Sequence, residues 1–237
     1  MKLKFIIKRL LYSYKASGKT YVDHLKSIGI SCGDNINIFC PKNTHIDTNN
    51  PYLLEIGNNV NMTGPITILT HDYSTSVLNK IDHKIYGKSR KTVIGNNVFL
   101  GWGCTVLAGT IIEDNVIIGA GAVVSGKVEK NSVYAGNPAK KIMSISEYRK
   151  KVIFNQKEEA FNIYKNYRDK FDMIPDINIF HEYFYLFAND YDELTNTLKN
   201  KLLEENISRE TFENNVGVYK SYEDFIDYCN KRYSHKS

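Results

Sequence analysis

Residues 94–129 read IGNNVF, LGWGCT, VLAGTI, IEDNVI, IGAGAV and VSGKVE when they are divided into sixes. The first position of every six is aliphatic, the fifth is small or β-branched, and turn-forming Gly, Asn and Asp gather between them. An α-helix cannot keep positions six apart on one face, and a simple strand needs no turn every six residues. This period predicts a parallel β-helix, in which each repeat is a short strand plus a corner and stacked coils bury the aliphatic column.

The same repeat is present upstream from Ile56 to Tyr73, and the pentapeptide IGNNV occurs at both 56–60 and 94–98. The two copies are 38 residues apart, so a coil of 18 residues leaves an insertion of 20. Residues 74–93 break the repeat and have this length. We therefore expect a loop to leave the β-helix at 74–93, and residues 30–41 to form an earlier, less regular coil.

The chain divides into three parts: an N-terminal helical segment at 1–29, a β-helix domain at 30–143 and a helical extension at 144–237. A capping box at Ser144 to Glu147 starts the extension, and Pro175 interrupts its helical pattern. The extension is rich in Tyr and Phe. These aromatic residues are predicted to pack helices against one another, and the alternative is a platform for a sugar ring.

The net charge of +5 is concentrated at the N-terminus, where residues 1–30 hold seven Lys or Arg and one acid. No nucleic-acid-binding motif accompanies this charge, so we expect no nucleic-acid partner. The apolar residues of 1–15 have helical spacing: Leu3, Ile6, Ile7, Leu10 and Leu11. This segment is predicted to cap the open end of the β-helix, or to touch an anionic membrane surface as a basic amphipathic helix.

Two absences indicate a cytoplasmic protein. No secretory signal and no apolar run of about 18 residues is present in the sequence. The four cysteines are scattered without CxxC spacing, which disfavours a zinc ribbon or a disulfide scaffold. We expect a cytoplasmic location, with the N-terminal helix as the contact to the inner face of a membrane.

Among six histidines only His71 lies on a repeat coil, at the edge of the insertion and near a corner. Imidazole titrates near neutral pH, so this side chain is a candidate general base, although by spacing alone a lone histidine is more often structural. Asp72 is a candidate to orient the imidazole or simply marks the departure of the chain from the coil. Neighbours on an extended chain point opposite ways, which disfavours the orienting role.

Several pieces of sequence recur in one order: Thr-His-Asp at 70–72, the insertion, IGNNVFLG at 94–101, IIGAGAVV at 117–124 and YAGNPAK at 134–140. With these pieces the chain resembles the hexapeptide-repeat acyltransferases, which are left-handed β-helix O-acetyltransferases. Its acidic, aromatic tail makes it similar to those of bacterial capsule and O-antigen gene sets. The resemblance implies a mainly β protein, a left-handed parallel β-helix with an N-terminal helical segment and a C-terminal α-helical extension.

The resemblance also implies a homotrimer with active sites between neighbouring β-helices. Acetyl-CoA is then the donor, no metal is required, and the acceptor is a hydroxyl of a sugar or polysaccharide. His71 is implied as the general base of direct transfer, so Cys104 is left to core packing. The positions that match cofactor-binding residues of the family are Trp102, Ala120, Ser125 and Lys140. The sequence departs from the family pattern at two positions: Phe99 replaces a Trp that is common in the family, and Gly126 replaces a common Lys.

Two other hypotheses about the function remain open. A γ-type carbonic anhydrase shares the β-helix but needs three His at one zinc site, and only His71 lies on a coil here. A non-catalytic β-helix that binds a glycan or acts as a scaffold also fits the repeat, because the repeat alone specifies architecture and no chemistry.

Overall fold

The structure of the protein is a computed structural model that describes residues 7–8, 10–205 and 207–234. It divides into two compact units, Met1–Arg149 and Lys150–Ser237. The first unit contains all the strands of the described residues, from Ser31 to Ser144. Each unit has a hydrophobic core of its own.

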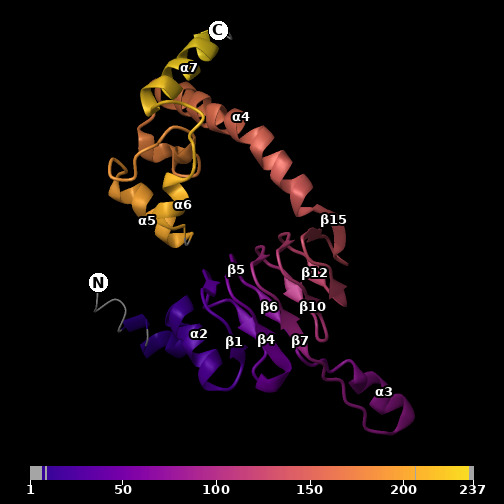
Figure 1. Ribbon diagram of the computed structural model, residues 1–237. Coiled ribbons are helices and arrows are strands. Elements are labelled where there is room, and N and C mark those ends of the chain that lie inside the picture. Colours follow the sequence, from indigo (N-terminus) through magenta and orange to yellow (C-terminus); the bar gives the residue numbers. More distant parts are fainter. Residues whose placement is uncertain (1–6, 9, 206, 235–237) are drawn as a thin grey trace. The chain divides into compact units, whose positions relative to one another are not determined.

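Three sheets form the first unit, and the chain passes from one to the next at each corner of a coil (Figure 1). The first sheet contains β1 (Ser31–Cys32), β4 (Leu54–Ile56), β7 (Thr92–Ile94), β10 (Ile111–Ile112) and β13 (Lys127–Val128). The second contains β2 (Asn37–Ile38), β5 (Val60–Met62), β8 (Val98–Leu100), β11 (Val116–Ile118), β14 (Ser132–Ala135) and β15 (Lys140–Ser144). The third contains β3 (His45–Ile46), β6 (Thr67–Ile68), β9 (Thr105–Val106) and β12 (Val123–Val124).

The strands stack in parallel and in register, which confirms the parallel β-helix predicted from the repeat. Ile56 pairs with Ile94, and Ile94 pairs with Ile112. The first and fifth positions of the repeats point inward, and Leu100, Val106 and similar residues are 0–1% exposed. The final pair, β14 with β15, is antiparallel, whereas the other strand pairs of the described residues are parallel. The aliphatic column is therefore one continuous core along the coils.

Asparagines form the corner between the first and second sheets. Asn97 and Asn115 have left-handed backbone conformations, which Asn tolerates better than other residues with a side chain. The Asn97 side chain donates to Asn115 Oδ1 at 2.8 Å, and Asn115 donates to Asn131 Oδ1 at 2.9 Å. This amide ladder links consecutive coils at the corner, where the turn leaves backbone groups exposed.

The open end of the β-helix is closed by α2 (Gly18–Ser27), which follows the short helix η1 (Ser13–Ala16). Tyr21 and Leu25 of α2 are almost fully buried and join the β-helix core. The apolar residues Ile7, Leu10 and Leu11 are exposed instead, so their predicted capping role is wrong. Leu3 and Ile6, which belong to the same predicted stripe, lie outside the described residues.

The insertion follows β6 as predicted. It differs from the prediction in two ways: it contains a helix, and it ends before residue 92 instead of at residue 93. Residues Thr75–Asp82 form the helix α3. Thr92 already belongs to β7, because it pairs with Leu54 of β4; its side chain is buried, and its hydroxyl donates to the Leu69 carbonyl at 2.7 Å. The two arms of the insertion meet at its base, where His71 and Ser89 form an antiparallel bridge.

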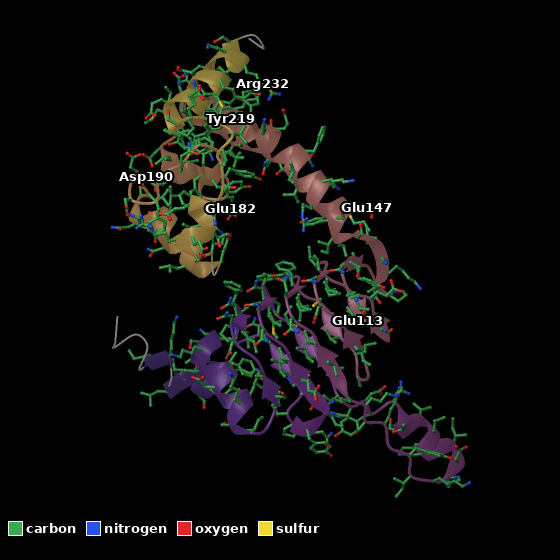
Figure 2. All side chains as sticks on the ribbon, in the orientation of Figure 1. Glu113, Glu147, Glu182, Asp190, Tyr219 and Arg232 are labelled. Carbon is green, nitrogen blue, oxygen red and sulfur yellow. The ribbon has the colours of Figure 1, made fainter. Side chains whose placement is uncertain are left out.

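The second unit is helical. Its elements are the main part of α4 (Ile145–Phe171), then η3 (Ile177–Phe180), η4 (Phe184–Leu186), α5 (Asn196–Glu204), α6 (Arg209–Glu213) and α7 (Tyr222–Ser234). The predicted capping box is confirmed, because Ser144 N donates to Glu147 Oε2 and Glu147 N donates to Ser144 Oγ. Glu147 is labelled on the ribbon in Figure 2. α4 ends at Phe171, shortly before Pro175.

The aromatic residues of the second unit pack on one another. Phe180 and Phe225 are completely buried, and their ring centroids are 5.1 Å apart at nearly perpendicular planes. Such edge-to-face contacts stabilise a core of large rings. These buried rings confirm the packing interpretation and leave no sugar platform at Phe180 or Phe225. Among the described residues, no helix has the length and apolarity to cross a membrane.

The stacking of coils requires Gly57 to lack a side chain. A Cβ at this position would lie 2.6 Å from the Gly95 carbonyl oxygen of the next coil, which is backbone and cannot rotate away. We expect Gly57→Ala to lower the free energy of unfolding by about 1–3 kcal/mol. Gly87→Ala is the control, because no atom lies within 4 Å of its added Cβ. Urea unfolding of both variants checks this, and equal stability of the two would contradict it.

Candidate active site

His71 lies at the corner between the third and first sheets, where the chain leaves the coil for the insertion. Its Nδ1 atom hydrogen-bonds to Oδ2 of Asp47. The His71 side chain is 18% exposed and the Asp47 side chain 3%. The imidazole is therefore accessible, and the carboxylate behind it is shielded from water.

The surroundings of Asp47 keep its carboxylate charged. Burial alone raises the pKa of Asp47, but hydrogen bonds from the Thr70 hydroxyl and from the backbone N–H groups of Asn49 and Thr70, together with the contact to His71, lower it to about 2. A charged carboxylate only accepts hydrogen bonds, so the Nδ1 atom of His71 carries the hydrogen. In neutral His71 the lone pair then belongs to Nε2, and this nitrogen can accept a proton.

Asp72 does not orient His71. Its carboxylate contacts Lys88 Nζ at 2.5 Å and accepts from Ser74 N at 2.6 Å. The hydrogen bond from Lys88 is the largest cause that holds the pKa of Asp72 well below its usual range. Asp72 thus fastens the two arms of the insertion, and the orienting role that the sequence offered for it is wrong.

Asp47 was not among the residues predicted to contact His71. The pairing of β3 with β6, with Ile46 opposite Ile68, brings Asp47 under the end of the next strand. An acidic residue directly after a strand of the first coil was the available signal. The offset between these two coils differs from that of the regular repeats, so the period did not place Asp47 next to His71.

The four predicted cofactor residues fall at three places on the β-helix. Trp102 and Ala120 stack in consecutive coils at the corner between the second and third sheets, where Gly121 N donates to the Trp102 carbonyl at 2.8 Å. Lys140 begins β15 and pairs with Ala135 of β14, one coil beyond this corner. Ser125 follows β12 at the corner of His71, two coils further along.

Trp102 is 60% exposed and lies over Gly64 of the preceding coil. A Cβ at Gly64 would lie 2.5 Å from Cδ2 of the indole, so a glycine is required for this placement. The third sheet separates Trp102 from His71, because Trp102 precedes its strand β9 and His71 follows its strand β6, so the two side chains lie at opposite ends of neighbouring parallel strands. One chain therefore brings Trp102 and Ala120 together but does not bring them to His71.

The described residues contain no group of three or more His, Cys, Asp or Glu side chains arranged to hold a metal ion.

Known proteins with related sequences share the repeat region. Residues 91–126 match the family described as "Bacterial transferase hexapeptide (six repeats)". Protein CapG of Staphylococcus aureus is 36% identical over 133 residues, which are 56% of this chain and 76% of CapG. The putative lipopolysaccharide biosynthesis O-acetyl transferase WbbJ of Escherichia coli (strain K12) is 51% identical over 53 residues, 22% of this chain and 27% of WbbJ.

A solved structure, that of a maltose O-acetyltransferase from Clostridium difficile 630, is 25% identical in sequence and superposes with a TM-score of 0.40. The alignment covers 60% of this chain and 84% of that protein. The match to CapG extends over most of that protein, so the chain belongs to the family of bacterial hexapeptide-repeat transferases. The predicted fold class, the predicted family and the predicted enzyme class, an acetyltransferase, are confirmed.

The lowered pKa of Asp47 predicts how stability depends on pH. An unfolded Asp titrates near pH 4, whereas Asp47 stays charged in the folded chain down to a pH of about 2. Its contribution is complete above pH 4 and is lost as the pH falls through 2. We expect the unfolding free energy to fall more steeply between about pH 5 and pH 3 in the native chain than in Asp47→Asn. Urea unfolding at fixed pH measures both slopes, and equal slopes would contradict the assignment.

Proposed function

We propose that the protein transfers the acetyl group of acetyl-CoA directly to a hydroxyl of a sugar or cell-surface polysaccharide, with His71 as the general base. The observation that supports this role is the hydrogen bond between His71 Nδ1 and the buried, charged Asp47. It directs the basic Nε2 atom away from the carboxylate. WbbJ, a putative O-acetyl transferase of lipopolysaccharide biosynthesis, supports the acceptor class.

The reaction needs no covalent intermediate on the protein. His71 Nε2 removes the proton of the acceptor hydroxyl as that oxygen bonds to the thioester carbonyl carbon. The carbon–sulfur bond then breaks, and the imidazolium returns the proton to the CoA thiolate. Asp47 stabilises the imidazolium while it exists. Cys104 does not compete as a nucleophile, because it is 1% exposed and burial raises the pKa of its thiol to about 12.

The donor is placed along the corner of Trp102 and Ala120, with Lys140 beyond them. The exposed indole of Trp102 provides an apolar wall for the pantetheine chain, and the exposed ammonium of Lys140 suits a phosphate group. Ser125 lies at the corner of His71 and contacts the cofactor from that side. These four assignments follow the resemblance to the family, and their placement is consistent with an extended ligand.

The active form is proposed to be a homotrimer. Trp102 precedes β9 and His71 follows β6, so they lie at opposite corners of the third sheet, and a compact site that contains both types of residue needs a second copy of the chain. A neighbouring β-helix supplies that second copy if the seam between copies contains the site. We place the reaction in the cytoplasm, where the donor is made and where the four free cysteines stay reduced.

The direct experiment is incubation with acetyl-CoA and a panel of glycans, followed by mass spectrometry for added acetyl mass. A product with one added acetyl group and release of free CoA supports the proposal. Binding of a glycan without any turnover would favour the non-catalytic scaffold instead.

Replacement of the base is the sharpest test of mechanism. We expect His71→Ala to lower kcat by about 10²–10⁴-fold, because the acceptor hydroxyl loses its proton acceptor. Asp47→Asn should lower kcat less, because the imidazole keeps Nε2 but loses the charge that stabilises its protonated form. His83→Ala, an exposed histidine of the insertion, is the matched control and should leave kcat unchanged. Full activity of His71→Ala with the fold intact would overturn the assignment.

The donor site has a separate kinetic signature. We expect Trp102→Ala to raise the KM for acetyl-CoA about tenfold or more, because the apolar wall is lost, while the KM for the acceptor changes little. Steady-state kinetics with each substrate varied in turn measures both constants. Leu203→Ala removes another exposed apolar side chain, in the second unit, and serves as the control. An unchanged KM for acetyl-CoA would remove Trp102 from the donor site.

A further inference from the structure

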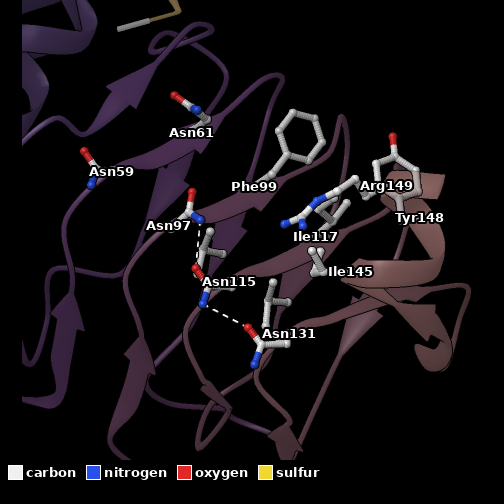
Figure 3. A pocket seen from close by; sticks show the side chains of 12 residues that line it. Asn59, Asn61, Asn97, Phe99, Asn115, Ile117, Asn131, Ile145, Tyr148 and Arg149 are labelled. Carbon is white, nitrogen blue, oxygen red and sulfur yellow. Dashed lines mark hydrogen bonds between the residues drawn. The ribbon is translucent and has the colours of Figure 1, made fainter. Parts of the chain in front are cut away.

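A groove of about 520 Å³ crosses the outer face of the second sheet (Figure 3). His71 lies at the corner between the third and first sheets, away from this face, and neither His71 nor Trp102 lines the groove. Its floor is a row of outward residues from three neighbouring strands, Asn61 of β5, Phe99 of β8 and Ile117 of β11. The first turn of α4 forms one wall with Tyr148 and Arg149. This volume is within the range of about 300–1,000 Å³ that is usual for small-molecule sites.

The wall is fixed by the end of the β-helix. Ile145 N donates to the Asn131 carbonyl oxygen at 2.9 Å, so α4 begins at the corner of the last coil. The capping box of Ser144 and Glu147 then holds this first turn. Figure 3 shows Arg149 reaching back from α4 over the sheet, with Tyr148 beside it and Phe99 across the groove.

The amide ladder of the neighbouring corner is interrupted beside this groove. Asn35 donates to Asn59, and Asn97 donates to Asn115, but no bond joins Asn59 to Asn97 (Figure 3). The Nδ2 groups of Asn59 and Asn61 and the Oδ1 atom of Asn97 therefore have no partner among the described residues. Donors and an acceptor are available together at one end of the groove, as adjacent hydroxyl groups of a sugar require.

Arg149 is the single basic residue of the lining, and its guanidinium makes no ion pair or hydrogen bond with the described residues. No Asp or Glu is among the described residues that line the groove. A guanidinium binds a carboxylate or a phosphate through two parallel hydrogen bonds. Phe99 and Tyr148, each a little over one-third exposed, present apolar ring surface to the same space. Sugar rings place their C–H faces on such aromatic surfaces while their hydroxyls bond to amides.

We propose that this groove binds an anionic saccharide unit of the acceptor, with its charged group on Arg149, its ring against Phe99 and Tyr148, and its hydroxyls on the unpaired amides. The inference rests on the proposed sugar acceptor and narrows it to acidic glycans. CoA fits the groove less well, because it carries several phosphate groups and the lining offers one cation. Since His71 lies on another face, this chain's groove contributes binding and not proton transfer.

The experiment measures binding without acetyl-CoA. Oligomers of glucuronic, galacturonic and mannuronic acid, their neutral hexose counterparts and the corresponding sugar phosphates are titrated into the full-length protein by calorimetry. We expect at least one anionic saccharide to bind, its neutral counterpart to bind at least tenfold more weakly, and added salt to weaken binding. Whether the uronates or the sugar phosphates bind shows which anionic group the groove recognises.

Arg149→Gln should weaken this binding at least tenfold, and Phe99→Ala should weaken it for the neutral and charged forms alike. Lys150→Gln, the same loss of charge one residue further along and outside the lining, is the matched control and should change binding less than twofold. Binding that Arg149→Gln leaves intact, no binding of any anionic saccharide, or displacement by CoA with the same dependence on Arg149 would overturn the proposal.

The two proposals fail separately. Acetyl transfer is measured on the panel of glycans with His71→Ala as the inactive variant, whereas saccharide binding is measured with that residue intact and no donor present. Loss of binding with transfer retained removes only the groove, and absence of transfer with Arg149-dependent binding removes only the catalytic assignment.

Discussion

Register between consecutive coils is the constraint on which the first unit depends. Each backbone strand bonds to its equivalents in the coils on either side, so a coil that shifted by one residue would turn its aliphatic column outward. Glycine at the corners allows the close approach: added Cβ atoms at Gly57 and Gly95 would lie less than 3 Å from the next coil. Asparagines in the left-handed conformation close the turn and bond to each other along it. Fold and site both follow from this one alignment.

The same alignment assembles the His71 site from distant parts of the sequence. Asp47 follows β3 and His71 follows β6, and the pairing of these strands brings a buried carboxylate to an imidazole. Thr70 satisfies that carboxylate twice, through its backbone N–H and its hydroxyl. Three other interactions hold the departing chain in place: the Asp72–Lys88 ion pair, the bond from Asp72 N to the Lys88 carbonyl and the bond from Arg90 N to the Thr70 carbonyl. The insertion therefore begins on a rigid base, and the imidazole is positioned by the coil and not by the loop.

The regular part of the sequence predicted the regular part of the structure. From Ile56 onward the period of six specified the strands, their inward faces and the presence of an insertion, because identical repeats pair in only one register. Prediction failed where the repeat is irregular. In the first coil, Cys32 pairs with Ile56 but His45 pairs with Thr67, so the offset changes within one turn and the period could not place Asp47. The prediction of the cap failed for a related reason: residues 7–11 and α2 both have apolar residues at helical spacing, and what distinguishes them is that the apolar residues of α2 join the buried cluster of the β-helix.

A triangular β-helix has three outer faces, and the outer faces of the second and third sheets carry different side chains here. The third sheet carries small outward side chains, Thr67, Thr105 and Val123, between the corner of Trp102 and the corner of His71. The second sheet carries Phe99 and the first turn of α4, which makes a walled groove out of a flat surface. The capping box at Ser144 decides where that turn begins, so a local helix signal at the end of the repeat sets the shape of a ligand-sized space. A chain whose last coil ran on without α4 would keep the dyad of His71 and Asp47 and lose the guanidinium that makes the groove selective for charge.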